Sequence, residues 1–169
     1  MNQKEGEIHA LCDLIYNDQS QFLLEIGNEK GDTLSFISQY ASPTATLIGI
    51  DINPVPIPKL ATDMQKVYLI QGDSHQLETL QAVKGVLKGN YLDFLFIDGD
   101  HFGAYRDYKM YGSLVRPGGI IAFHDIVSGN LKNVGTVPSD WVSVKQGKDT
   151  LEIVDDWKQG GWGIGVIRV

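Results

Sequence analysis

FLLEIGNEKG, residues Phe22–Gly31, is an apolar run of strand length that ends at a turn bounded by glycines. The run barely alternates between apolar and polar residues, which is typical of a strand buried on both faces of a sheet. Four further runs rich in Ile, Leu, Phe or Val follow along the chain: Thr46–Asp51, Val67–Gln71, Leu92–Asp98 and Ile120–His124. The five runs together predict the buried strands of a parallel sheet.

The segments between these runs carry apolar residues at spacings of three or four, as amphipathic helices do. They predict helices at Asn2–Tyr16, Asp32–Tyr40, His75–Leu87 and Ala104–Val115, the last of which stops at Arg116-Pro117-Gly118-Gly119. Strands that alternate with helices at this pitch are joined by crossover connections in a mostly parallel sheet.

The carboxyl-terminal part of the chain has a different pattern. Thr150–Val154 and Gly163–Val169 predict two closing strands that pair antiparallel, and Trp141–Lys145 fits a helix or a short strand, with the helix favoured. We therefore expect an α/β, doubly wound, Rossmann-like fold: a seven-stranded, mostly parallel sheet with an antiparallel last strand and helices on both faces. Residues 1–169 would form one domain, with an N-terminal helix in 1–19 and the core in 20–169.

Composition excludes several classes of function. The 169 residues are 43% hydrophobic, and their formal net charge of −7 argues against binding to nucleic acid or to an anionic membrane. No apolar run approaches the roughly 18–20 residues of a membrane span, and Met1–Glu7 lacks the apolar core of a secretion signal. The single cysteine, Cys12, suits a reducing compartment and is expected to be buried and inert. We expect a cytoplasmic protein.

Acidic residues follow the predicted strands, and ligands of such sheets bind beyond the carboxyl ends of the strands. The Gly27–Gly31 turn either brings the backbone close to a ligand or is an ordinary connection. Asp51 is suited to accept hydrogen bonds from a ribose diol, or to cap a helix from Pro54 onward. For Asp73-Ser74, capping of the next helix is likewise the alternative to a ligand contact. Taken together, these elements favour an adenosine-containing ligand across the first three strands.

The chain from Gln21 onward resembles class I S-adenosylmethionine-dependent methyltransferases, and in particular the small-molecule O-methyltransferases of the cephalosporin-hydroxylase and macrolide-sugar type. The motifs that carry this resemblance are Glu25-Ile26-Gly27-x-x-x-Gly31-x-Thr33, Gly49-Ile50-Asp51, Gly72-Asp73-Ser74, Phe96-Ile97-Asp98-Gly99-Asp100-His101, Gly118-Gly119-Ile120-Ile121-Ala122-Phe123-His124-Asp125 and Gly163-Ile164-Gly165-Val166-Ile167. Of these, the Asp98–His101 and Gly118–Asp125 motifs are the most specific.

The resemblance implies a site for S-adenosylmethionine (SAM). The Glu25–Gly31 turn would hold its amino-acid end, Asp51 its ribose, and Asp73 with Ser74 its adenine edge. The full set of implied cofactor contacts is Glu25, Gly27, Asn28, Gly31, Asp51, Ile52, Gly72, Asp73, Ser74 and Asp98.

The resemblance also implies a divalent cation at Asp98, His124 and Asp125, with Asp98 and His101 as catalytic residues and His101 as the base. A bound Mg²⁺ would lower the pKa of an acceptor hydroxyl, whereas a histidine ligand favours Mn²⁺, Fe²⁺ or Zn²⁺. A neutral imidazole can accept the proton at physiological pH. As the alternative, Asp98 and Asp100 only hydrogen-bond loop amides and His124 a neighbouring carbonyl.

The resulting expectation is SAM-dependent O-methylation of a small molecule or sugar. An NAD- or nucleotide-binding Rossmann protein and an inactive cofactor-binding module stay as alternatives. The chain departs from the family at Gly103, where many relatives carry tyrosine, and it has only a modest Ile126–Pro138 loop. The acceptor pocket is therefore expected to be open, or to be completed by another subunit of a homo-oligomer. His9 and His75 are expected at the surface. Trp157 and Trp162 are expected in packing roles, with a substrate-lining role as the alternative.

Overall fold

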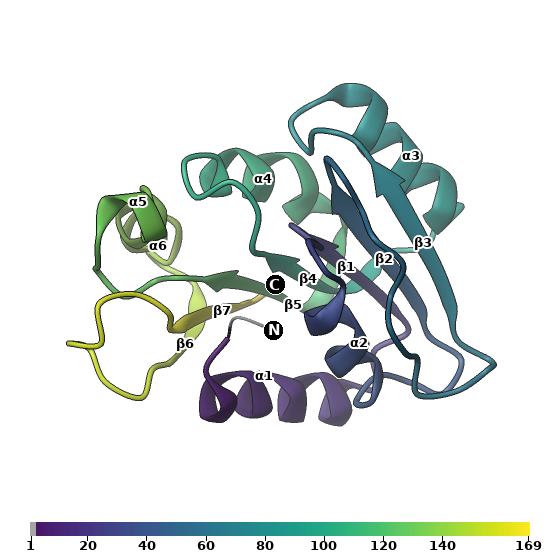
Figure 1. Ribbon diagram of the computed structural model, residues 1–169, viewed down its shortest axis with the longest axis horizontal. Coiled ribbons are helices and arrows are strands. Elements are labelled where there is room, and N and C mark those ends of the chain that lie inside the picture. The colour runs from purple at the N-terminus through teal and green to yellow at the C-terminus, as the bar shows by residue number, and fades with distance from the viewer. Residues whose placement is uncertain (1–2) are drawn as a thin grey trace.

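The computed structural model describes residues 3–169, whose centre is one seven-stranded sheet with the order β3-β2-β1-β4-β5-β7-β6 (Figure 1). Neighbouring strands pair in parallel from β3 to β5, whereas β7 runs antiparallel to both β5 and β6. The strand bounds are β1 Phe22–Ile26, β2 Thr46–Asp51, β3 Lys66–Gln71, β4 Leu92–Ile97, β5 Val115–His124, β6 Asp149–Ile153 and β7 Ile164–Arg168. The expected fold class and the antiparallel last strand are confirmed.

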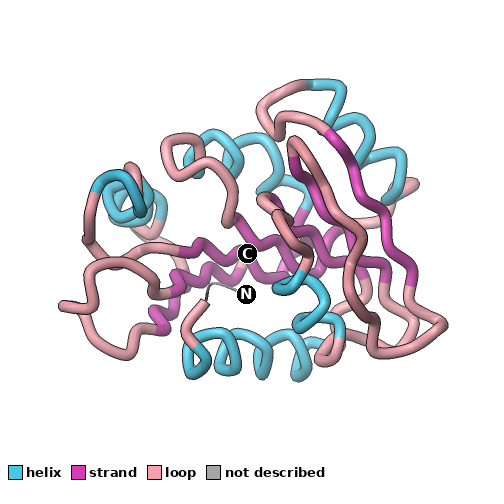
Figure 2. Tube along the Cα trace, viewed as in Figure 1, coloured by secondary structure: helices cyan, strands magenta, loops and turns pink. Residues whose placement is uncertain are grey.

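Helices cover both faces of the sheet (Figure 2). On one face α1 and α2 pack with inward side chains of the strands, and on the other face α3, α4 and α6 do so. The helix bounds are α1 Glu5–Asp18, α2 Asp32–Ser38, α3 Leu77–Leu87, α4 Ala104–Tyr111, α5 Leu131–Val134 and α6 Val137–Val144, with a 3₁₀ turn at Gly112–Leu114. The helix preference for Trp141–Lys145 is therefore confirmed.

Three boundaries differ from the sequence-based prediction. The helix before β5 ends at Tyr111, and β5 begins at Val115, so the Arg116–Gly119 segment lies inside the strand rather than after a helix. It stays in the sheet because Val169 donates to the carbonyl of Gly119 and accepts from the amide of Gly118. The segment predicted as a loop before Pro138 contains α5 and the start of α6. The first helix begins at Glu5, and the predicted start at Asn2 lies outside the described residues.

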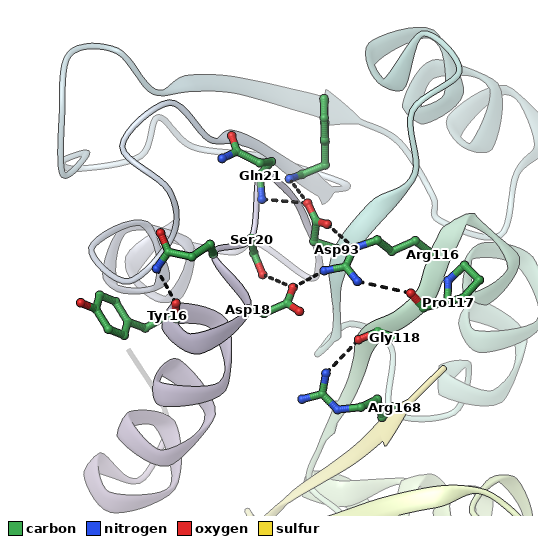
Figure 3. A network of polar contacts seen from close by, with 11 residues as sticks. Tyr16, Asp18, Ser20, Gln21, Asp93, Arg116, Pro117, Gly118 and Arg168 are labelled. Carbon is green, nitrogen blue, oxygen red and sulfur yellow. Dashed lines mark hydrogen bonds and ion pairs between the residues drawn. The ribbon is translucent and has the colours of Figure 1, made fainter.

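A polar network ties α1, β4 and β5 together at the amino edge of the parallel strands (Figure 3). Arg116 donates from Nε to Asp93 at 2.6 Å and from Nη2 to Asp18 at 2.7 Å. The other oxygen of Asp93 accepts from the amides of Gln21 and Phe22, at 2.7 and 2.8 Å. The network therefore lies at the edge of the sheet opposite the carboxyl ends of the parallel strands, where ligands of such sheets bind.

Within residues 3–169 no helix combines the length and apolar character that crossing a membrane requires.

Candidate active site

A cleft of about 1140 Å³ opens along the carboxyl ends of β1, β2, β3, β4 and β5. The predicted site residues that line it are Gly27, Asn28, Asp51, Ile52, Gly72, Asp73, Ser74, Asp98, His101, His124 and Asp125. The structure therefore brings the strand-end residues together on one surface. Glu25 and Gly31 are not among the lining residues.

The glycine turn after β1 has the backbone that its sequence predicts. Gly27 and Gly31 have φ angles of +91° and +72°, which residues with a side chain rarely adopt. A Cβ on Gly27 would lie 2.2 Å from the carbonyl oxygen of Asp98. Glycine is therefore required at position 27 for both its backbone conformation and the close approach of the two turns.

Asn28 and Glu25 place unpartnered polar atoms beside this turn. The side chain of Asn28 is 3% exposed and lines the cleft, and neither amide atom has a hydrogen-bond partner among the described residues. Glu25 is buried in β1, where burial and then the charges of Asp98 and Asp51 raise its pKa well above the usual range. Asn28 thus lines the cleft, whereas Glu25 does not, and burial disfavours the charged form of its carboxyl.

The acidic residue at the end of β2 fixes the local turn geometry. Asp51 accepts hydrogen bonds from the amides of Glu29 and Asn53, both at 2.8 Å. No helix follows in residues 52–65, so the alternative prediction that Asp51 caps a helix from Pro54 is wrong. The carboxylate instead joins the turns after β1 and β2 at the edge of the cleft.

The turn after β3 contains a residue that the sequence analysis assigned wrongly. Asp73 accepts from the amide of His75 at 2.8 Å and from the side chain of Gln76 at 3.1 Å. The His75 side chain is 14% exposed and lines the cleft, so its expected surface position is wrong. A signal was present in the sequence: His75 directly follows the Asp73-Ser74 pair that was assigned to the adenine edge.

Two histidines and two carboxylates meet at the ends of β4 and β5. His124 Nδ1 lies 3.0 Å from an oxygen of Asp98 and 3.3 Å from Asp125 Oδ2, and His101 Nε2 lies 3.0 Å from the same Asp125 oxygen. Ligand atoms of Asp98, His101 and Asp125 all lie within 4.8 Å of one another. The geometry therefore groups His101 with the two carboxylates as a candidate cation site, and the predicted ligand His124 also contacts both carboxylates.

The charges of this cluster shift its pKa values. Burial lowers the pKa of His124, but Asp98 and Asp125 outweigh burial and raise it to about 10. The hydrogen bond to Asp125 raises the pKa of His101 above its usual range. Burial alone would raise the pKa of Asp125, but the hydrogen bonds from His101 and His124 bring it below its usual range. The cluster therefore favours positively charged imidazole between carboxylates.

Residues that the sequence did not indicate complete the cleft on two sides. Gln3 donates to Asp98 at 2.6 Å and accepts from Thr33 at 3.0 Å. Gly160, Gly161 and Trp162 line the other side, and the amide of Trp162 donates to Asp125 at 2.7 Å. Residues 132–134 of the segment that contains α5 also line the cleft. All of these contacts join segments distant in sequence, so spacing gave no signal for them.

Comparisons with known proteins agree with this geometry at the level of fold. The O-methyltransferase of Bacillus cereus, solved in complex with S-adenosylhomocysteine (SAH), is 18% identical with a TM-score of 0.72, over 99% of this chain and 83% of that one. TomG of Streptomyces achromogenes, an O-methyltransferase of tomaymycin synthesis solved with SAM, is 16% identical with a TM-score of 0.72, over 98% and 80%.

A third structure is MycE, a methyltransferase of the mycinamycin pathway solved with Mg and SAH. It is 24% identical with a TM-score of 0.50, over 66% of this chain and 29% of that one. No curated protein gives a significant match.

The family is shown by a separate comparison. Residues 24–126 match the family model described as a methyltransferase domain, which is more than half of the 169-residue chain. The matched span runs from β1 to the residues just after β5, so it contains every strand end that lines the cleft. The resemblance first drawn from the motifs is confirmed, and the chain belongs to the methyltransferase domain family.

Proposed function

We propose that the chain transfers the methyl group of SAM to a hydroxyl oxygen of a small molecule or sugar. The observation that carries the proposal is the alignment on one cleft of the glycine turn after β1, Asp51 after β2 and Asp73-Ser74 after β3. The matched family and the SAH and SAM bound to the B. cereus and Streptomyces proteins support this cofactor. The low sequence identity leaves the acceptor to be identified by experiment.

Different residues of the cleft are suited to bind the ribose, the adenine and the amino-acid end of SAM. Asp51 offers carboxylate oxygens to a ribose diol, and Asp73 and Ser74 offer acceptors to the adenine edge. The buried, unpartnered amide of Asn28 would gain partners from the amino-acid end of the cofactor, which offsets the cost of burying it alone. Carboxylates along the edge also favour a sulfonium cation electrostatically.

His101 is the proposed base, and Asp125 orients it. Methyl transfer is an in-line displacement at carbon, so the chain's main task is to align the acceptor oxygen with the methyl group. With Nε2 donating to Asp125, the His101 imidazole has Nδ1 available to accept the hydroxyl proton. The pKa of His101 is raised by this hydrogen bond, which strengthens it as a base once it is neutral.

A divalent cation fits this cluster as an alternative to deprotonation by His101, because an imidazole that ligates a cation does not also serve as the base. Asp98, His101 and Asp125 would hold it, because their ligand atoms lie within 4.8 Å of one another and oxygen and nitrogen donors suit Mg²⁺ or Mn²⁺. A cation bound there would lower the pKa of an acceptor hydroxyl. The Mg in the MycE structure supports a test of this assignment. His124 is the alternative third ligand, because its Nδ1 lies 3.0 Å from Asp98 and 3.3 Å from Asp125.

The first experiment measures cofactor binding by isothermal titration calorimetry with SAH. We expect the wild type to bind, and Asp51→Ala to lose about ten- to a hundredfold in affinity, as for one hydrogen-bonded charge. Asp63→Ala, an exposed acid outside the cleft, is the matched control and should bind SAH normally. Binding of NAD in place of SAH would overturn the proposal. Failure to methylate any acceptor in a screen with labelled SAM would favour an inactive module.

The second experiment tests the cation with Mn²⁺, followed by electron paramagnetic resonance. We expect Asp98→Ala and His101→Ala to lose Mn²⁺ binding, and Asp100→Ala, which is outside the cluster, to keep it. If methyl transfer survives both chelation and the Asp98→Ala change, the cation plays no part, and His101 alone would carry the deprotonation.

We place the protein in the cytoplasm, with a small-molecule acceptor and no nucleic-acid partner. The single cysteine, Cys12, is buried and free, and the formal net charge is −7. Whether a second subunit completes the acceptor side is tested by sedimentation of the protein with and without SAH.

A further inference from the structure

The side chain of His75 lies between two turns that border the cleft. Its Nε2 is 3.3 Å from Asp107 Oδ1 and 3.3 Å from the carbonyl oxygen of Gly103, both of which belong to the start of α4. Asp107 is fully buried. The imidazole therefore connects the turn after β3 to the helix that follows β4.

Helix α4 holds the same turn through two further contacts. Arg106 donates from Nη2 to the carbonyl oxygen of His75 at 2.9 Å. The hydroxyl of Tyr111, a fully buried residue, donates to the carbonyl oxygen of Ser74 at 2.7 Å. Both backbone carbonyls of the Ser74-His75 pair are thus bound by one helix, so the turn and α4 form a single unit.

Gly103 is the position that makes room for this imidazole. A Cβ there would lie 2.2 Å from Cε1 and 2.6 Å from Nε2 of His75. Its φ of −114° is available to any residue, so the absence of a side chain serves space and not backbone conformation. Gly103 is also where the methyltransferase resemblance leads one to expect tyrosine. In this chain, His75 occupies that space instead.

We propose that His75, bound to the Gly103 carbonyl beside Asp107 and accommodated by the missing side chain of Gly103, is a positioning residue for the cofactor, which keeps Asp73 and Ser74 at the adenine edge. The proposal rests on the proposed SAM site. His75 is linked directly to the Asp73 carboxylate, because the backbone amide of His75 donates to it at 2.8 Å. A displacement of His75 therefore displaces that carboxylate as well. A missing or displaced imidazole would remove one of the contacts that attach the turn to α4, beside those of Arg106 and Tyr111.

The experiment is a double-mutant cycle on SAH affinity, measured by calorimetry. His75→Ala and Gly103→Ala should each weaken SAH binding about tenfold, the first by removing the imidazole and the second by displacing it. The double variant should bind no more weakly than His75→Ala, because the clash vanishes with the ring. Gly85→Ala, where a Cβ meets nothing within 4 Å, is the matched control and should bind SAH normally.

A second readout separates positioning from general destabilisation. The inosine analogue of SAH lacks the 6-amino group, so a displaced Asp73 should reduce the preference for SAH over this analogue in His75→Ala. Mere loss of stability would weaken both ligands equally. His75→Gln, whose amide can donate to Asp107, should restore part of the preference.

Three results would overturn the inference while the wild type still binds SAH: unchanged affinity in Gly103→Ala, additive losses in the double variant, or an unchanged ligand preference in His75→Ala. If Gly103→Ala does not fold, the comparison of His75→Ala with His75→Gln decides alone. A wild type that fails to bind SAH would instead contradict the proposed function.

Discussion

Gly27 combines a φ of +91° with a carbonyl oxygen of Asp98 that would lie 2.2 Å from any Cβ. A side chain at position 27 would therefore carry two separate energetic costs, one from the backbone conformation and one from the clash with Asp98. An alanine in the left-handed region costs about 1–2 kcal/mol, and the clash adds to this because the obstacle is backbone and not a flexible side chain.

The first prediction follows from that pair of costs. Gly27→Ala should lower the free energy of unfolding by more than about 2 kcal/mol, measured by urea denaturation, and should abolish SAH binding. Gly147→Ala is the matched control, since Gly147 has a φ of +67° but open space around its Cβ position. Gly147→Ala should lower the free energy of unfolding only by the cost of placing alanine at a positive φ. Equal losses in the two variants would contradict the role assigned to the contact with Asp98.

The second prediction concerns the pH dependence of stability at Asp107. Burial raises the pKa of this carboxyl to about 6, against about 3.9 in an unfolded chain. Because the folded-state pKa is the higher one, the group's contribution is complete below about pH 4 and is lost as the pH rises through 6.

Asp107→Asn should therefore cost about 1 kcal/mol more stability, relative to wild type, at pH 5 than at pH 8. The measurement is urea denaturation of both proteins at the two pH values. His75, Asp73 and Asp100 are also charged or titratable near this carboxyl, and comparing the variant with wild type reduces their contribution to the difference. A difference that is independent of pH would show that Asp107 does not titrate in this range.

Single residues were predictable from the sequence only where a motif or a conformational rule applied. The glycine turn was identified because glycine tolerates positive φ. The predicted burial of Cys12 is confirmed, and burial raises the pKa of its thiol to about 12. The position of His75 was missed because it depends on the space left by Gly103, 28 residues later in the chain. Pattern analysis treats each position in its local window and does not detect such complementarity.

Among the elements, α1 is joined to the connection between β6 and β7 through one carboxylate. Glu7 is fully buried on α1, where Oε1 accepts from the amide of Asp155 and the side chain of Gln159, and Oε2 from the amide of Gly163. The segment it holds also carries Trp162 on the side of the cleft. A glutamine at position 7 would carry an NH₂ group in place of one carboxylate oxygen. That group would face N–H donors that now bind Glu7 and could not accept hydrogen bonds from them.

Glu7→Gln should therefore loosen the 155–163 segment and destabilise the protein by about 1–3 kcal/mol. Hydrogen exchange of the amides in this segment, followed by mass spectrometry, should rise, and the thermal midpoint should fall. Glu5→Gln, an exposed acid in the first turn of the same helix, is the control and should change neither. Unaltered protection in Glu7→Gln would mean that the segment is held by other contacts.

The helices and strands themselves were largely predictable, because buried parallel strands and amphipathic helices have distinct periodicities. The prediction failed at Arg116–Gly119, where proline and glycine normally stop an element. There, backbone hydrogen bonds with Val169 from the far end of the chain keep the segment in the sheet. Tertiary pairing of this kind outweighs local preference, and no local window contains it.

For the whole molecule, the division into residues 1–19 and 20–169 is not a division into independent units. Ile8, Leu11, Cys12 and Ile15 of α1 are fully buried against the sheet. Burial of one such side chain is worth roughly 1.5–3 kcal/mol, and the net stability of a domain is only about 5–15 kcal/mol. Residues 20–169 alone should therefore lack a cooperative thermal transition by calorimetry. A sharp transition in that fragment would show that α1 is an accessory helix.

The overall topology could be predicted because strands alternating with helices permit few arrangements. The location of the cleft at the carboxyl edge followed from the same rule. The remaining sides of the cleft did not, since they are formed by Gln3, residues 132–134 and residues 160–162, which share no motif.

The reversed direction of β7 has a practical consequence for work with this protein. Val169 pairs with Gly119 at the start of the long strand β5, whose other end, His124, lies in the cleft. Gln3, by contrast, touches Asp98 inside the cleft. An affinity tag or a surface-immobilisation linker joined to the carboxyl terminus leaves the ligand entrance unobstructed. The contact of Gln3 with Asp98 makes the amino end the less suitable place for the same tag.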